Sequence, residues 1–199
     1  MVYICFNQFK YRSRYFVKVS KVKLDWLKVK SVFNWFLLLK EKTNMLHCAT
    51  FGAGCFWSVE ALFAGQQGVT STSVGYMGGH TDSVTYEQIC TDTTGHVEVV
   101  DLKFDDHVIS YQDLLQLFWA NHDPTTPNRQ GPDHGSQYRS VVFYHTEIQR
   151  RQALGIRQQL DRSRIYSAPI VTTIEAATRY HKAEEYHQKY LQKLKMSRL

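Results

Sequence analysis

Segments patterned as β-strands alternate with segments patterned as α-helices from Met45 onward, and this alternation most constrains the fold. Residues 69–76 alternate with β-branched side chains, which is typical of a strand. Residues 110–118 combine a Ser–Asp capping pattern with apolar side chains at helical spacing, which predicts a helix. The predicted strands are residues 47–52, 69–76, 98–104, 139–144 and 170–174, and the predicted helices are 55–64, 111–118, 146–162 and 183–194, with a helical turn at 85–90. This order favours a mixed α/β or α+β sandwich.

The length and the composition agree with one globular domain. The chain has 199 residues, 43% of them hydrophobic, which is enough for a sizeable core. No apolar run reaches the roughly 18 residues of a spanning helix, so we expect no membrane span. The four cysteines form neither a CxxC pair nor a zinc-ligand spacing with histidine. We therefore expect no metal site, and we expect a cytoplasmic monomer in a reduced compartment.

The net positive charge of the chain comes from its N-terminal segment. Residues 1–44 hold ten Lys or Arg and two acidic residues, which leaves 14 basic and 16 acidic groups in residues 45–199. The latter segment therefore lacks the basic surface of a nucleic-acid binder. Three interpretations of residues 1–44 stay open: a basic extension, a membrane-surface segment, or translated sequence upstream of a true start at Met45. We favour the third, with residues 45–199 as a self-contained domain.

A long loop at residues 122–137 interrupts the alternation of elements. It contains four turn-forming pairs, at Asp123-Pro124, Thr126-Pro127, Gln130-Gly131 and His134-Gly135. A loop of this length inside a compact domain is uncommon and is usually functional.

Cys55 is the strongest candidate for a catalytic residue. It follows Gly54 and begins a predicted helix, and the N–H groups at a helix start favour a thiolate. Such a thiolate would be nucleophilic near neutral pH. The next two residues, Phe56 and Trp57, would form an apolar wall beside the sulfur. The alternative interpretation is a buried structural cysteine.

Four segments resemble one known family in order and spacing. They are GAGCFW around Cys55, TGHVE at 94–98, HDPTTPNRQGPDHGSQYRS at 122–140 and YHKAEEYHQKYL at 180–191. Together they are similar to peptide-methionine (S)-S-oxide reductases of the A class, over about Ala49 to Leu191. The resemblance implies an enzyme that reduces methionine S-sulfoxide, free or in proteins, and so repairs oxidised proteins. We expect a single α+β domain, a two-layer sandwich with a mixed sheet, a ferredoxin-like core and the long functional loop, with residues 45–199 as the catalytic domain.

The resemblance also implies roles for individual residues. Cys55 would attack the sulfoxide sulfur, and Phe56 and Trp57 would receive the methyl group. Glu98 would protonate the sulfoxide oxygen, and its apolar neighbours in the sequence would raise the pKa of its carboxyl group enough for this task. Without the motif, Glu98 would be interpreted as a surface carboxylate.

Further residues of the site come only from the motif match. Tyr86 and Tyr138 would donate hydrogen bonds to the same oxygen, and Asp133 would lie near the site. His96 and His187 also fall within matching segments, but we interpret both as hydrogen-bonded structural histidines.

The resemblance implies a sulfenic acid on Cys55 that a second thiol must reduce. Many family members carry recycling cysteines in a C-terminal tail, but no cysteine follows Cys90 here. We therefore expect a one-cysteine cycle with thioredoxin, glutaredoxin or a small thiol as external reductant. Cys90 is the remaining candidate for a resolving thiol. The sequence contains no GxGxxG motif, and we expect no bound cofactor.

Two other functions fit a reactive cysteine at a helix start. A thiol peroxidase would need an Arg or Thr beside the cysteine, whereas the neighbours here are Phe56 and Trp57. A non-enzymatic module that senses redox state or binds methionine sulfoxide is the other alternative.

Overall fold

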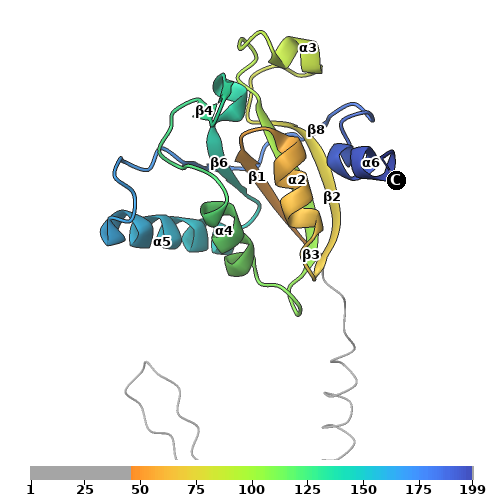
Figure 1. Ribbon diagram of the computed structural model, residues 1–199. Helices are drawn as coiled ribbons and strands as arrows, with labels where there is room; N and C mark the ends of the chain where they lie inside the picture. The colour runs from red at the N-terminus through yellow and green to blue at the C-terminus, as the bar shows by residue number, and fades with distance from the viewer. Residues whose placement is uncertain (1–45, 199) are drawn as a thin grey trace, which may run out of the picture. The chain divides into compact units, whose positions relative to one another are not determined.

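A mixed six-stranded sheet forms the centre of the protein in the computed structural model, which describes residues 46–198 (Figure 1). The strand order is β7-β6-β1-β3-β2-β8, and only the pair β6–β7 is parallel. The strands are β1 (Leu46–Ala53), β2 (Val69–Met77), β3 (Val97–Asp105), β6 (Ser140–Tyr144), β7 (Thr173–Ala176) and β8 (His181–Lys182). The mixed sheet confirms the α+β class. The predictions for residues 1–44 lie outside the described residues.

Three helices, α2 (Phe56–Ala64), α4 (Tyr111–Ala120) and α5 (Glu147–Ser163), cover one face of this sheet (Figure 1). The short helix α3 (Tyr86–Ile89) lies beyond the end of the sheet, and α6 (Tyr190–Met196) packs beside α2. Side chains from α2, α4 and α5 join alternate residues of the central strands in one buried cluster. A smaller cluster on the opposite face is covered by Ala177 and Tyr180. No helix among residues 46–198 is long and apolar enough to cross a bilayer.

Phe51 on β1 is the centre of the larger cluster. Its ring is fully buried and stacks on Phe63 of α2, at 5.0 Å between centroids, and on Phe118 of α4, at 5.3 Å. The start of α4 is a capping box, as the sequence predicts, in which Ser110 and Asp113 satisfy each other's backbone N–H groups. The apolar face of α4 is thereby held over the strand that leads to Cys55.

The predicted loop at residues 122–137 contains local structure. Two short strands, β4 (Arg129–Gln130) and β5 (Asp133–His134), form a hairpin, and a 3₁₀ turn, η1 (Ser136–Tyr138), follows. Gly131 joins the two strands in a left-handed conformation, with φ of 56°.

The prediction for the C-terminal region was partly wrong. The strand expected at 170–174 is Thr173–Ala176, and the helix expected at 183–194 begins only at Tyr190. Residues 183–189 instead run along the edge of β2, and Lys189 adopts a left-handed conformation with φ of 52°. The reason is visible at Gln188, whose buried side chain hydrogen-bonds main-chain groups that a helix could not reach.

Gln188 completes the edge of β2 beside β8. Its Oε1 accepts from the Val74 N–H at 3.0 Å, and its Nε2 donates to the carbonyl oxygens of Val74 and Ala183 at 2.9 and 2.8 Å. Because these groups are buried, no water replaces the bonds when the side chain is removed.

Replacing Gln188 by Leu is therefore expected to lower the free energy of unfolding by about 2–3 kcal/mol, because the Val74 N–H loses its partner. Urea denaturation of the two proteins measures this difference. The matched control is Gln159→Leu on the exposed surface of α5, which should change stability by less than about 0.5 kcal/mol. Equal effects of the two substitutions would contradict the role of Gln188.

Candidate active site

Cys55 lies at the junction of β1 and α2. Gly54 precedes it in a left-handed conformation, with φ of 89°, and a Cβ atom there would lie 2.7 Å from the Gln130 side chain. The glycine therefore lets the 129–134 hairpin pack against the nucleophile's own turn. Cys55 is the N-cap residue of α2 and is half-buried, so the helix begins at Phe56, one position after the start that the sequence predicts.

The pKa of Cys55 is raised, not lowered. Removal of the sulfur from water is the largest cause, and the charges of Glu98 and Asp133 act in the same direction. Hydrogen bonds from the N–H groups of Trp57 and Ser58 lower the pKa, as expected at a helix start, but they are outweighed. The sequence-based expectation of a free thiolate near neutral pH is thus corrected: the resting sulfur is a thiol.

Glu98 reaches the start of α2 from β3. Its side chain is buried, with 2% of its surface exposed, and its Oε2 accepts a hydrogen bond from the Phe56 N–H at 3.1 Å. Burial raises the pKa of this carboxyl to about 7, and the nearby charge of Asp133 adds to the shift. The direction agrees with the sequence-based expectation. Near neutral pH this group exists in both the acid and the carboxylate form.

Two tyrosines approach the same carboxyl group. Tyr86 begins α3 after a capping box at Thr85, and Tyr138 ends η1. Burial raises the pKa of Tyr138 to about 12, with Glu98, Asp133 and Cys55 among the further causes. The pKa of Tyr86 is also raised, by burial first, with Cys90 and Tyr138 contributing. Both phenols stay protonated and are available as hydrogen-bond donors.

An aromatic cluster lies beside these donors. Phe56 is buried against His187, at 5.1 Å between ring centroids, and Tyr86 lies 4.6 Å from the same imidazole. Trp57 stacks on Tyr190 at 4.0 Å and donates its Nε1–H to Nδ1 of His187 at 3.1 Å. The indole is therefore held in one orientation.

The two predicted structural histidines differ. His96 accepts from the Gly79 N–H and has its second ring nitrogen 3.1 Å from the Thr81 hydroxyl, so both of its nitrogens are partnered. His187 uses only Nδ1, while its buried Nε2 makes no hydrogen bond and lies 3.9 Å from Glu184. Its description as fully hydrogen-bonded is therefore wrong for one nitrogen.

Glu184 is a residue of the site that sequence reasoning missed. Its carboxylate accepts from the Tyr86 N–H and from the Tyr76 hydroxyl, each at 3.0 Å. It thereby holds the start of α3, and with it Tyr86, against the C-terminal segment. Its place in the segment YHKAEEYHQKYL was the only signal that could have identified it.

The described cysteines are all free thiols. They are Cys48 on β1, Cys55, and Cys90 at the end of α3, where it is exposed and close to Tyr86. No disulfide joins any of these three residues.

A cavity of about 370 Å³ opens beside Cys55. It lies between α2, α4 and the β4–β5 hairpin, and it does not include the tyrosines, Glu98 or Trp57. Its lining is Ala53, Cys55, Ser58, Val59, Leu62, Phe63, Phe118, Asn121, Gln130, Gly131, Pro132 and Asp133.

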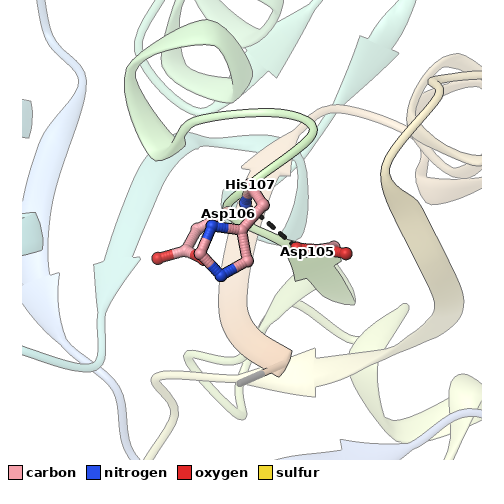
Figure 2. Close-up of side chains that lie close together, drawn as sticks. All are labelled: Asp105, Asp106 and His107. Atoms are coloured by element: carbon pink, nitrogen blue, oxygen red, sulfur yellow. Dashed lines mark hydrogen bonds and ion pairs between the residues drawn. The ribbon is translucent and has the colours of Figure 1, made fainter. Parts of the chain in front are cut away.

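One group of metal-type donors occurs in residues 46–198, at Asp105, Asp106 and His107 (Figure 2). The group lies at the end of β3 and in the turn after it, near the first residue of β1, whereas Cys55 lies two residues beyond the last residue of β1. An eight-residue strand separates the two places by roughly 25 Å. His107 N–H donates to Asp105, and His47 pairs with Asp106 at 3.1 Å, so partners within the protein already engage these acids. We assign no metal to the group.

Comparisons with known proteins agree on one family. Residues 47–198 match the family model described as peptide methionine sulfoxide reductase. The chain is 59% identical over 145 residues to peptide methionine sulfoxide reductase MsrA of Methanothermobacter thermautotrophicus, covering 73% of this chain and 86% of that protein. It is 52% identical over 153 residues to MsrA of Geobacter metallireducens, covering 77% and 94%.

Solved structures show the same relationship. Mxr1 from Saccharomyces cerevisiae in reduced form has a TM-score of 0.71 at 33% identity, covering 77% of this chain and 88% of that chain. Methionine sulfoxide reductase A of Corynebacterium diphtheriae has a TM-score of 0.71 at 32% identity, covering 77% and 76%.

The buried carboxyl of Glu98 is expected to make stability depend on pH. Its pKa is about 7 in the native protein and about 4.5 when solvated, so the unfolded chain loses this proton first as the pH rises. Stability should therefore fall between pH 4.5 and 7 and level off above. Glu98→Gln removes the titration, so the variant should gain about 3 kcal/mol relative to the wild type between pH 4 and pH 8.

Chemical denaturation of both proteins across this range measures the difference, because all other titrating groups are common to the two. If the free energy of unfolding changed with pH in the same way for both proteins, Glu98 would have an ordinary pKa.

Proposed function

The chain belongs to the peptide methionine sulfoxide reductase family, whose members are oxidoreductases that reduce methionine sulfoxide, and we propose how its residues carry out the reaction. The substrate is methionine S-sulfoxide, free or in oxidised proteins, and Cys55 attacks its sulfur. One observation supports this most directly: a half-buried thiol, a carboxyl with a pKa of about 7 and two protonated phenols share one site.

Glu98 acts as the proton donor. A sulfoxide is a weak electrophile until its oxygen is protonated, so the reaction needs an acid near the operating pH. A carboxyl with a pKa of about 7 meets this requirement. Tyr86 and Tyr138 donate hydrogen bonds to the same oxygen, which stabilises the charge that develops there.

The protons balance without an outside donor. The thiol of Cys55 and the sulfoxide give a sulfenic acid and a thioether, so the step as a whole neither consumes nor releases a proton. Glu98 gives its proton to the oxygen and regains one from the thiol. This exchange explains how a cysteine with a raised pKa can act as the nucleophile near neutral pH.

Phe56 and Trp57 receive the methyl group of the sulfoxide. Trp57 is fixed by its stacking on Tyr190 and its hydrogen bond to His187, so its apolar face is presented without loss of rotamer freedom. Asp133 lies at the rim, where its charge acts on Cys55, Glu98 and Tyr138.

An external thiol returns the sulfenic acid to the thiol. In this proposal Cys90, exposed at the end of α3, has no resolving role. The reductant is thioredoxin, glutaredoxin or a small thiol. The yeast protein Mxr1, which is similar in fold, has been solved in complex with Trx2.

Residues 45–199 form the catalytic domain in this proposal. The unit β1-α2-β2-β3-α4-β6, with strand order β6-β1-β3-β2, is its ferredoxin-like core. The 122–137 loop brings Asp133 to the site, and Tyr138 follows directly after this loop.

The proposal predicts distinct effects of single substitutions on reduction of an S-epimer sulfoxide with dithiothreitol. Cys55→Ser should abolish turnover, and Glu98→Ala should lower kcat/KM by about 10²–10⁴-fold because the proton donor is lost. The matched control Cys90→Ser should keep the wild-type rate. A wild type without turnover would overturn the function, and equal consumption of peroxide would favour a thiol peroxidase.

One turnover without added thiol is expected to leave a single oxygen atom on Cys55. Mass spectrometry should detect a dimedone adduct at this residue, because dimedone reacts with sulfenic acids. A stable Cys55–Cys90 or Cys48–Cys55 disulfide would overturn the one-cysteine cycle. Cys90→Ser provides the comparison, since its adduct should match that of the wild type.

A further inference from the structure

The cavity beside Cys55 and the proposed substrate site lie on opposite sides of α2. Ser58, Val59 and Leu62 follow Cys55 at spacings of three, four and seven residues, so they share one helix face, and all line the cavity. Trp57 points from the other face, toward α6, where it stacks on Tyr190. Cys55 and Asp133 are the residues that both places share.

The second half of the reaction needs access from a different direction than the first. A sulfenic acid on Cys55 would carry its oxygen among Glu98, Tyr86 and Tyr138, where the sulfoxide oxygen lay. A thiolate attacks divalent sulfur in line with the bond that breaks, hence from the side opposite to that oxygen. The cavity is the open space on that side.

We propose that this cavity binds the recycling reductant and that the reductant is a small-molecule thiol. The inference rests on the proposed function, because it needs the sulfenic acid. The thiolate forms a disulfide bond with Sγ of Cys55, the S–O bond breaks, and the oxygen leaves as water with a proton from Glu98. A second molecule of the thiol then reduces the mixed disulfide and restores the Cys55 thiol.

The size and the walls of the cavity suit a small molecule. A volume of about 370 Å³ lies within the range of ligand pockets, and the lining includes the apolar residue Leu62 and the buried rings of Phe63 and Phe118. Asn121 and Gln130 add polar side chains to the lining.

The charge of the cavity lining indicates which thiols would bind there. Asp133 is the one ionisable side chain that lines it besides Cys55, and no basic side chain belongs to the lining. A neutral or cationic thiol therefore fits better than an anionic one, because an anion would meet the Asp133 carboxylate without a cation to offset it. The probes are 2-mercaptoethylamine, 2-mercaptoethanol and 3-mercaptopropionate, which are similar in size and differ in charge.

The test separates the two half-reactions in the full chain. The first half-reaction is measured as the methionine released in a single turnover without thiol. The second is measured by mass spectrometry, as the rate at which the mixed disulfide forms on Cys55 after each probe is added. In the wild type this rate should saturate with thiol concentration, and at equal thiolate concentration the amine should react faster than the acid.

Leu62→Trp fills the cavity from α2, and Asn121→Trp fills it from the exposed end of α4. Each should slow mixed disulfide formation at least tenfold and leave the first half-reaction unchanged. The matched control is Leu154→Trp, at an exposed leucine of α5, which should change neither. The Asn121 variant keeps the test valid if the Leu62 variant does not fold.

Three results would count against the inference in different ways. No methionine release by the wild type would overturn the proposed function itself. Normal release with unchanged recycling in both tryptophan variants would overturn the reductant cavity alone. A slower first half-reaction with a peptide sulfoxide, but not with free methionine sulfoxide, would show that the cavity holds the substrate's peptide chain instead.

Discussion

The hydrogen bond from the Phe56 N–H to the Glu98 carboxyl is the contact on which the site depends. It joins the first turn of α2 to β3, two elements that are 42 residues apart in sequence. Antiparallel pairing of β1 with β3 brings them together, because Phe51 lies opposite Val100 and the chain then runs on to Cys55 beside Glu98. The nucleophile and its acid are thus placed by sheet register.

Burial raises the pKa of both the Cys55 thiol and the Glu98 carboxyl. Water is excluded from both, so the neutral forms of Cys55 and Glu98 are favoured and both pKa values rise. Each group would add to the cost of ionising the other. When Glu98 carries its proton, such a site can exchange protons internally between the carboxyl and the thiol, which suits a reaction that has no net proton change.

The sequence predicted the parts of the structure that depend on local pattern. The capping box at Ser110 and the apolar spacing behind it identify α4, and the apolar neighbours of Glu98 indicate its raised pKa. The helix start at Cys55 was also recognisable, but its effect on the sulfur was not, because desolvation depends on residues brought from elsewhere. The C-terminal segment was misassigned for the same reason: the contacts of Gln188 with Val74 cross 114 residues of sequence.

The β4–β5 hairpin connects the two halves of the proposed cycle. Gln130, Gly131 and Pro132 border the cavity on one side of Cys55, while Asp133 acts on the Cys55 sulfur and on Glu98. The hairpin can approach this closely because Gly54 has no side chain, and any Cβ atom there would displace Gln130. A substitution at Gly54 would therefore disturb the substrate side and the cavity side together, whereas a substitution in the cavity wall would disturb one alone. The missing side chain at Gly54 is thus what lets one hairpin border both sides of Cys55.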